Sequence, residues 1–199
     1  MKLPGSYQKS SSSRMLIGLS AGSCFATDIY QNFYIGLIPF LVLKFNLSLA
    51  QVSLMGATSI IANCLFSPLF GYMSDRYGFK YFVVAGPLFS LIFLSIIGVI
   101  PKLWLVLLIL FFGNLAIATF HPSSVPIAGY HRGNRKGLGT SLINFGGIFG
   151  GAIGAFLIIV IYEKTGIILT LFLMIFGFIT AILIVGFLPD KKNKLHKKK

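Results

Sequence analysis

The sequence is poor in charge, and acidic residues are the scarcest of all: Asp and Glu together number 4 among 199 residues, and charged residues of both signs make up 11%. Soluble globular domains carry roughly 25% charged residues. A chain that is 56% hydrophobic therefore has too little polar surface to face water on every side. The composition excludes an ordinary soluble domain, because part of the apolar surface must face lipid, and we predict an all-α integral membrane protein.

Cysteines are few as well, and motifs typical of enzymes and of metal sites are missing from the sequence. Only two cysteines are present, Cys24 and Cys64, and both fall inside apolar runs, where cysteine acts as a small buried hydrophobe rather than as half of a disulfide framework. We find no glycine-rich nucleotide loop, no nucleophile with a partner base and no spacing typical of metal ligands. Nothing in the pattern supports an enzyme, a metal or another cofactor.

Long apolar runs are what the chain has in abundance. About 20 apolar residues cross a bilayer, so 199 residues allow at most about six crossings. Ser48 and Gln51 have the spacing of a capping box, and Pro101 ends one run before Trp104 begins the next. We predict an N-terminal segment at 1–14, a bundle at 15–188 and a basic tail at 189–199, with six transmembrane helices in the bundle at 15–43, 49–72, 81–100, 103–129, 138–162 and 167–188.

The first of these helices has an alternative interpretation. Lys2 and Lys9 followed by the apolar run 15–26 imitate a signal peptide. The apolar character resumes at Ile29 and continues to Leu43, which favours a retained membrane helix.

The net charge of +13 is compatible with nucleic-acid binding, but its distribution favours a membrane. Lys44, Lys102 and Lys164 fall on one side of the predicted bundle, and the rest of the 17 basic residues fall on the other. Basic residues gather on the cytoplasmic side of membrane proteins and contact anionic headgroups there. We therefore expect an inner-membrane protein with both termini in the cytoplasm, anionic lipids as partners and no nucleic acid.

One cytoplasmic loop carries a charged motif between two apolar helices, "GYMSDRYGFK" at 71–80. It resembles the G-x-x-x-D-R-x-G-x-K signature of the major facilitator superfamily of transporters, and it lies in the loop between the second and third helices, where that family carries it. The resemblance implies a gating motif whose aspartate meets the start of a helix in the opposite half of the transporter, where a carboxylate gains about 0.3–1 kcal/mol. The matching residues are Gly71, Asp75, Arg76, Gly78 and Lys80.

The resemblance covers the first half of such a transporter over nearly the whole chain. Major facilitators have two six-helix halves related by an axis along the membrane normal. It therefore implies half of a major facilitator fold that is completed by dimerisation with a second copy. A heteromer with a related half and an isolated fragment are the alternatives. "NFGGIFGGAIGA" (144–155) presents small residues that let helices approach closely in lipid. We expect them at the dimer interface, with packing inside one copy as the alternative: Gly146, Gly147, Gly150, Gly151 and Gly154.

Two ionisable residues lie deep in the predicted spans. Asp28 is about 21 Å along its helix from Arg14, and His121 is about 15 Å from His131, so the two can share a layer if their helices face each other. Desolvation favours a protonated carboxyl group and histidine titrates near neutrality, so together they make a candidate proton site. A helix–helix hydrogen bond without titration is the alternative.

Four neighbours complete the predicted cavity: Gln31, Asn32, Asn114 and Pro122. Pro122 and Pro126 are expected to interrupt the fourth helix. "DIYQ" (28–31) and "FHPSS" (120–124) resemble the fosmidomycin-resistance branch of drug exporters. This likeness implies proton-coupled efflux of a small organic molecule by alternating access. A passive facilitator and a non-transporting partner or regulatory subunit are the competing interpretations.

Overall fold

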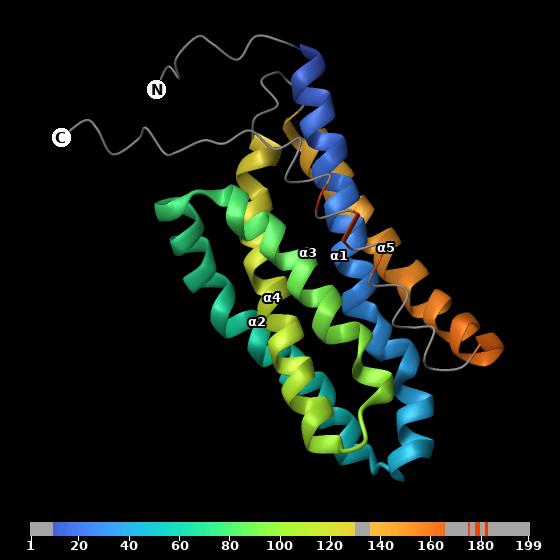
Figure 1. The fold of residues 1–199 in the computed structure, drawn as a ribbon. Coiled ribbons are helices and arrows are strands. Elements are labelled where there is room, and N and C mark those ends of the chain that lie inside the picture. Colours follow the sequence, from blue (N-terminus) through green and yellow to red (C-terminus); the bar gives the residue numbers. More distant parts are fainter. Residues whose placement is uncertain (1–9, 130–135, 166–174, 176–177, 180–181, 183–199) are drawn as a thin grey trace.

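The computed structural model describes residues 10–129 and 136–165, together with the helical positions 175, 178, 179 and 182. The elements are α1 (Ser10–Phe45), α2 (Leu49–Tyr77), α3 (Phe79–Ser95), η1 (Ile97–Val99), α4 (Leu103–Gly129) and α5 (Lys136–Thr165). The α-helices of this part of the chain range from 17 residues in α3 to 36 residues in α1, and one short 3₁₀ turn follows α3 (Figure 1).

The first five predicted helices correspond to α1 to α5, with shifted ends. α1 begins at Ser10 rather than at 15, and α3 ends at Ser95 with η1 occupying part of the predicted third helix. α4 runs unbroken through Pro122 and Pro126 to Gly129, so the predicted interruption is corrected. Most of the sixth predicted helix, 167–188, lies outside the described residues.

Four described segments are long and apolar enough to cross a membrane: Leu49–Tyr77, Tyr81–Val99, Leu103–Ser124 and Gly137–Lys164. α1 is 36 residues long but is not among the four in the described part of the chain. Its central stretch carries Asp28, Gln31 and Asn32, which lower its apolar content. In the part of the chain that the structure describes, the protein is thus all-helical, with four helices of membrane-spanning length and composition.

The helix ends have local causes. Asn46 adopts the left-handed conformation with φ 50°, and the Leu47 N–H donates to Val42 O at 3.1 Å, which closes the end of α1. Ser48 and Gln51 form the predicted capping box at the start of α2. The Lys44 ammonium group donates to Gly98 O at 3.0 Å and to Ile100 O at 2.7 Å, so it supplies partners for carbonyl groups at the end of η1.

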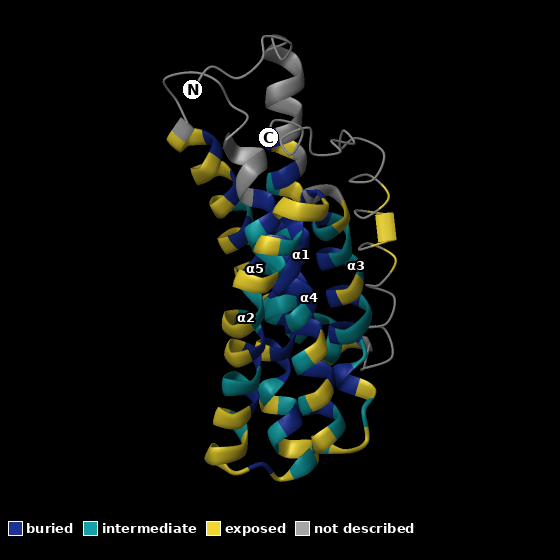
Figure 2. Cartoon of the chain, turned by 90° about the vertical axis from the view of Figure 1, so that its left-hand side faces the viewer, coloured by how far each residue is buried: buried dark blue, intermediate teal, exposed yellow. Residues whose placement is uncertain are grey.

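α1 and α4 form the centre of the bundle. α1 packs along α5, while α4 packs against both α2 and α3, as Figure 1 shows. The main core lies between these helices and includes Tyr30 and Phe33 of α1, Leu94 of α3 and Leu110 of α4. In Figure 2 buried positions concentrate on α1 and α4, and exposed positions follow α2. This arrangement places the central polar residues of α1 opposite α4.

Candidate functional site

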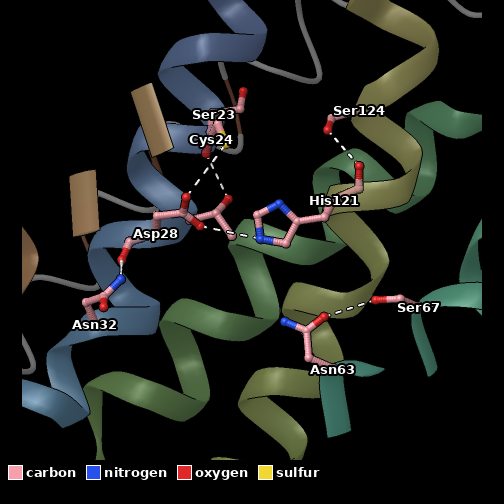
Figure 3. Close-up of polar contacts among 9 residues, drawn as sticks. Ser23, Cys24, Asp28, Asn32, Asn63, Ser67, His121 and Ser124 are labelled. Carbon is pink, nitrogen blue, oxygen red and sulfur yellow. Dashed lines mark hydrogen bonds and ion pairs between the residues drawn. The ribbon is translucent and has the colours of Figure 1, made fainter. Parts of the chain in front are cut away.

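Asp28 of α1 and His121 of α4 face each other in the interior of the bundle (Figure 3). His121 Nε2 lies 3.5 Å from Asp28 Oδ1, and the side chains are 39% and 14% exposed, respectively. The structure therefore brings together the two ionisable residues that the sequence analysis singled out. The carboxylate is the more enclosed group, while the imidazole keeps access to the surface of the bundle.

The Asp28 carboxyl group has an unusual environment. Its Oδ1 atom is buried and accepts no hydrogen bond from the described residues, although it is near the histidine. Its Oδ2 atom accepts a weak hydrogen bond from the Cys24 thiol at 3.8 Å. Burying a carboxylate with incomplete hydrogen bonding is costly, so this oxygen favours a proton or a cation as a partner.

The predicted amides have different roles in the structure. Asn32 Nδ2 donates to Asp28 O at 2.8 Å, one turn back on α1, and Gln31 is half-buried beside it in the sequence. Asn114 is fully buried and donates to Leu110 O at 2.9 Å in its own helix. Asn114 therefore belongs to the core, and its placement as a cavity-lining residue is corrected.

Pro122 follows His121 directly and is half-buried. A Cβ atom added to Gly71 of α2 would lie 3.4 Å from Pro122 Cβ. The first glycine of the charged motif thus packs α2 against α4 next to the candidate site. Side-chain hydroxyl groups of the same turn bond to the helix backbone, with Ser123 Oγ donating to Thr119 O and Ser124 Oγ donating to His121 O.

The five glycines of α5 point toward α1 of the same chain. Added Cβ atoms at Gly146, Gly150 and Gly154 would collide with backbone atoms of α1. At Gly147 a Cβ would collide with Asp28 Oδ2 and with Cys24 Sγ, and at Gly151 it would meet the amide of Asn32. Their assignment to a dimer interface is therefore corrected: these glycines let α1 and α5 approach closely within one chain.

The charged motif ends α2 and begins α3. Gly78 has φ 103°, a conformation that L-residues rarely adopt, and its N–H donates to Ser74 O at 2.9 Å. Asp75 and Arg76 are exposed, and the Arg76 guanidinium lies 5.6 Å from the centre of the Tyr77 ring. Lys80 lies in α3, with its side chain outside the described part of the chain.

Cys24 was not predicted to belong to the site. The thiol is buried, as expected, but it contacts the Asp28 carboxyl group. Cys24, Asp28 and His121 can each offer one ligand atom to a metal ion, and these three atoms lie within 4.8 Å of one another. The i, i+4 spacing of Cys24 and Asp28, which places both on one face of a helix, is the signal that points to this contact. Cys64 differs from expectation in being exposed.

Comparisons with known proteins identify the family of the chain. Residues 19–199 match the sequence profile of the Major Facilitator Superfamily. The chain is also 29% identical over 161 residues to the fosmidomycin resistance protein of Escherichia coli strain K12, an alignment that covers 81% of this chain and 40% of that relative. The chain thus spans less than half the length of this relative. The polar α1–α4 pair, the charged motif between α2 and α3, and the match over residues 19–199 lead to one conclusion: the chain belongs to the Major Facilitator Superfamily of transporters and is related to the fosmidomycin-resistance branch.

Proposed function

We propose that this protein is a proton-coupled antiporter that exports a small organic molecule by alternating access. The observation that carries the proposal is the Asp28–His121 pair, with 3.5 Å between Oδ1 and Nε2 and a half-buried imidazole. Ionisable groups inside a membrane domain are costly to place and mark ion or substrate pathways. The relative that carries fosmidomycin resistance in its name supports efflux as the direction.

The pair offers a physical basis for coupling. When the carboxylate and the imidazolium are both charged, the pair is neutral overall; loss of the histidine proton leaves a net negative charge, and protonation of the aspartate leaves a net positive charge. Each of these states has a different hydration cost in an open and in a closed cavity. A proton can shift a conformational equilibrium only through such a difference between the two conformations, and the enclosed Asp28 carboxyl group is suited to create it.

The motif between α2 and α3 is, in our proposal, the gate on the cytoplasmic side. Asp75 is exposed at the end of α2, and a carboxylate at a helix N-terminus gains about 0.3–1 kcal/mol. An interaction of this strength is weak enough to be broken in each transport cycle. Gly78 supports the gate by allowing the sharp turn into α3.

A transport pathway of this kind needs a second bundle opposite α1 and α4. We propose that a second copy of this chain supplies it, in the parallel two-fold arrangement of the two halves of a major facilitator. Closed two-fold pairs are the commonest oligomers. Because the α5 glycines are already occupied by α1, the contact would use the outward apolar side chains of α2 and α5, such as Leu65 and Phe145, which are exposed. We further propose an inner-membrane location with cytoplasmic termini.

Disulfide crosslinking tests the second copy. Single cysteines are placed on the outward faces of α2 and α5 in two differently tagged copies that are co-expressed in one membrane. Crosslinks between α2 of one tag and α5 of the other support the pair. The absence of crosslinks at every position contradicts the pair. Crosslinks to a protein of another mass also contradict it and favour a related half as the partner.

Reconstituted vesicles test the transport function. Radiolabelled fosmidomycin serves as the probe, and an imposed pH gradient is the driving force. We expect the probe to accumulate against its gradient and an ionophore that dissipates the pH difference to abolish accumulation. Flux that ignores the pH gradient would indicate a passive facilitator, and no flux for this probe or for a panel of small organic molecules would indicate a non-transporting subunit; both results contradict the proposal.

A further inference from the structure

The Asp28–His121 pair has a third member that proton coupling does not use. The Cys24 thiol lies one turn before Asp28 on α1, is 3% exposed and is 3.8 Å from Asp28 Oδ2. A thiol, a carboxylate and an imidazole therefore meet at one point, drawn from two helices that are far apart in sequence (Figure 3). We propose that Cys24, Asp28 and His121 form a binding site for a divalent transition-metal ion, with Zn²⁺ as its preferred occupant.

Two of the distances in the cluster are close to those in the coordination shell of zinc. Zinc binds sulfur at about 2.3 Å and nitrogen or oxygen at about 2.0–2.2 Å in a tetrahedron, which separates neighbouring ligand atoms by about 3.3–3.8 Å. His121 Nε2 and Asp28 Oδ1 are 3.5 Å apart, and Cys24 Sγ and Asp28 Oδ2 are 3.8 Å apart. With one atom from each residue, all three ligands lie within 4.8 Å of one another. The three ligand atoms would have to move closer together to surround one ion.

The chemistry of the three ligands favours zinc over magnesium or calcium. Thiolate and imidazole are the softer ligands that suit zinc, whereas magnesium and calcium prefer an all-oxygen shell. On coordination the Cys24 thiol releases its proton to water, and the resulting thiolate and the carboxylate together balance the charge of the ion. The buried Asp28 Oδ1, which lacks a hydrogen bond from the described residues, would gain a partner.

The cluster is closed on one side and open on the other. Gly147 of α5 packs directly against it, because a Cβ atom there would collide with the Asp28 carboxyl group and the Cys24 sulfur. His121 is 39% exposed, so its side of the cluster is accessible. Three protein ligands with one open position are typical of zinc sites that bind water or a small ligand.

Metal binding does not depend on the proposed function, but one consequence does. A bound ion would occupy both groups of the proton pair and would hold α1 and α4 together. Zinc should therefore inhibit proton-coupled transport. If transport is absent but the ion binds as described below, the proposed function fails and the metal site stands. If transport occurs but the ion does not bind, the metal site fails and the proposed function stands.

The test measures binding of Zn²⁺ and Co²⁺ to the full chain in lipid nanodiscs. The protein is purified with an affinity tag that contains no histidine. Zinc affinity is measured by competition with a chromophoric chelator, and Co²⁺ reports its ligands because a thiolate ligand produces a charge-transfer absorption band. We expect one ion per chain at the cluster and a thiolate band.

Two cysteine variants form a matched pair. Cys24→Ser removes the sulfur ligand and should weaken zinc binding by at least about tenfold, since even changes outside the first ligand shell cost about 10- to 100-fold, and should abolish the thiolate band. Cys64→Ser changes the exposed cysteine of α2 and should alter neither. Asp28→Asn, which keeps the side-chain volume, should weaken zinc binding to a similar extent, and circular dichroism checks that every variant is folded.

Two results would overturn the inference. The first is zinc affinity in Cys24→Ser equal to that of the unmodified chain, wherever the ion then binds. The second is the absence of a thiolate band in the cobalt spectrum of the unmodified, folded chain.

Discussion

The contact between α1 and α5 can be tested with a single methyl group. At Gly150 an added Cβ would lie 2.9 Å from both the C and the Cα atom of Phe25, and the carbonyl oxygen of Phe25 is closer still. Ordinary van der Waals contact begins at 3.4 Å. Because these are backbone atoms of a helix, they cannot rotate away. The helices must separate by about 0.5–1 Å, which forfeits a quarter to a half of the dispersion energy of the atoms in contact.

The magnitude follows from two opposing effects. Overpacking costs about 1–3 kcal/mol, whereas replacing glycine by alanine inside a helix returns up to about 1 kcal/mol. Gly137 in the first turn of the same helix is the matched control, because an added Cβ there meets no described residue within 4 Å. We expect Gly150→Ala to be less stable than Gly137→Ala by about 1–3 kcal/mol, or about 5- to 150-fold in the unfolding equilibrium.

The assay is equilibrium unfolding in mixed micelles, with increasing sodium dodecyl sulfate and far-ultraviolet circular dichroism as the readout. Gly137→Ala should unfold at the same or a higher detergent fraction than the unmodified protein, and Gly150→Ala at a lower one. Equal midpoints for the two variants would refute the reasoning, because a backbone-to-backbone contact cannot absorb a methyl group without cost.

Three further predictions concern the helix ends. Gly78→Ala should destabilise the α2–α3 turn by about 1–3 kcal/mol, the cost of a sparsely populated backbone conformation for an L-residue, measured by the same unfolding assay; an unchanged midpoint would contradict the positive φ. Ser48→Ala should cost about 0.5–2 kcal/mol through loss of the cap, and Ser53→Ala on an exposed turn of α2 is its control, so equal midpoints would argue against the capping box. Lys44→Met removes the donor to Gly98 O and Ile100 O, and hydrogen exchange around η1 should then be faster; unchanged exchange would show that these bonds do not order the turn.

Some parts of the fold were predictable because their causes are local. The Ser48–Gln51 capping box depends on four consecutive residues, so its sequence signature is sufficient. The depth of Asp28 and His121 follows from the constant rise of a helix, and this explains why two residues that are 93 positions apart in sequence were placed in one layer.

Other parts depend on contacts that the sequence does not specify. A stripe of small residues fits a neighbouring helix of the same chain as well as it fits a second copy. The sequence therefore could not predict that the α5 glycines face α1. Asn114 shares a helical face with His121 by spacing, but neighbouring helices cover it completely. Proline positions were misleading in α4, because loss of one backbone N–H per proline does not by itself end a membrane helix.

We propose above that Asp28, beside His121, binds and releases a proton during transport. The most direct measurement compares two activities of the same vesicles: accumulation of the labelled probe driven by a pH gradient, and exchange of labelled for unlabelled probe without a gradient. Glu163→Gln, at an exposed acidic residue near the end of α5, is the control and should keep both activities. For Asp28→Asn we predict that exchange persists while gradient-driven accumulation is lost. Full gradient-driven accumulation in a correctly inserted Asp28→Asn protein would contradict the account.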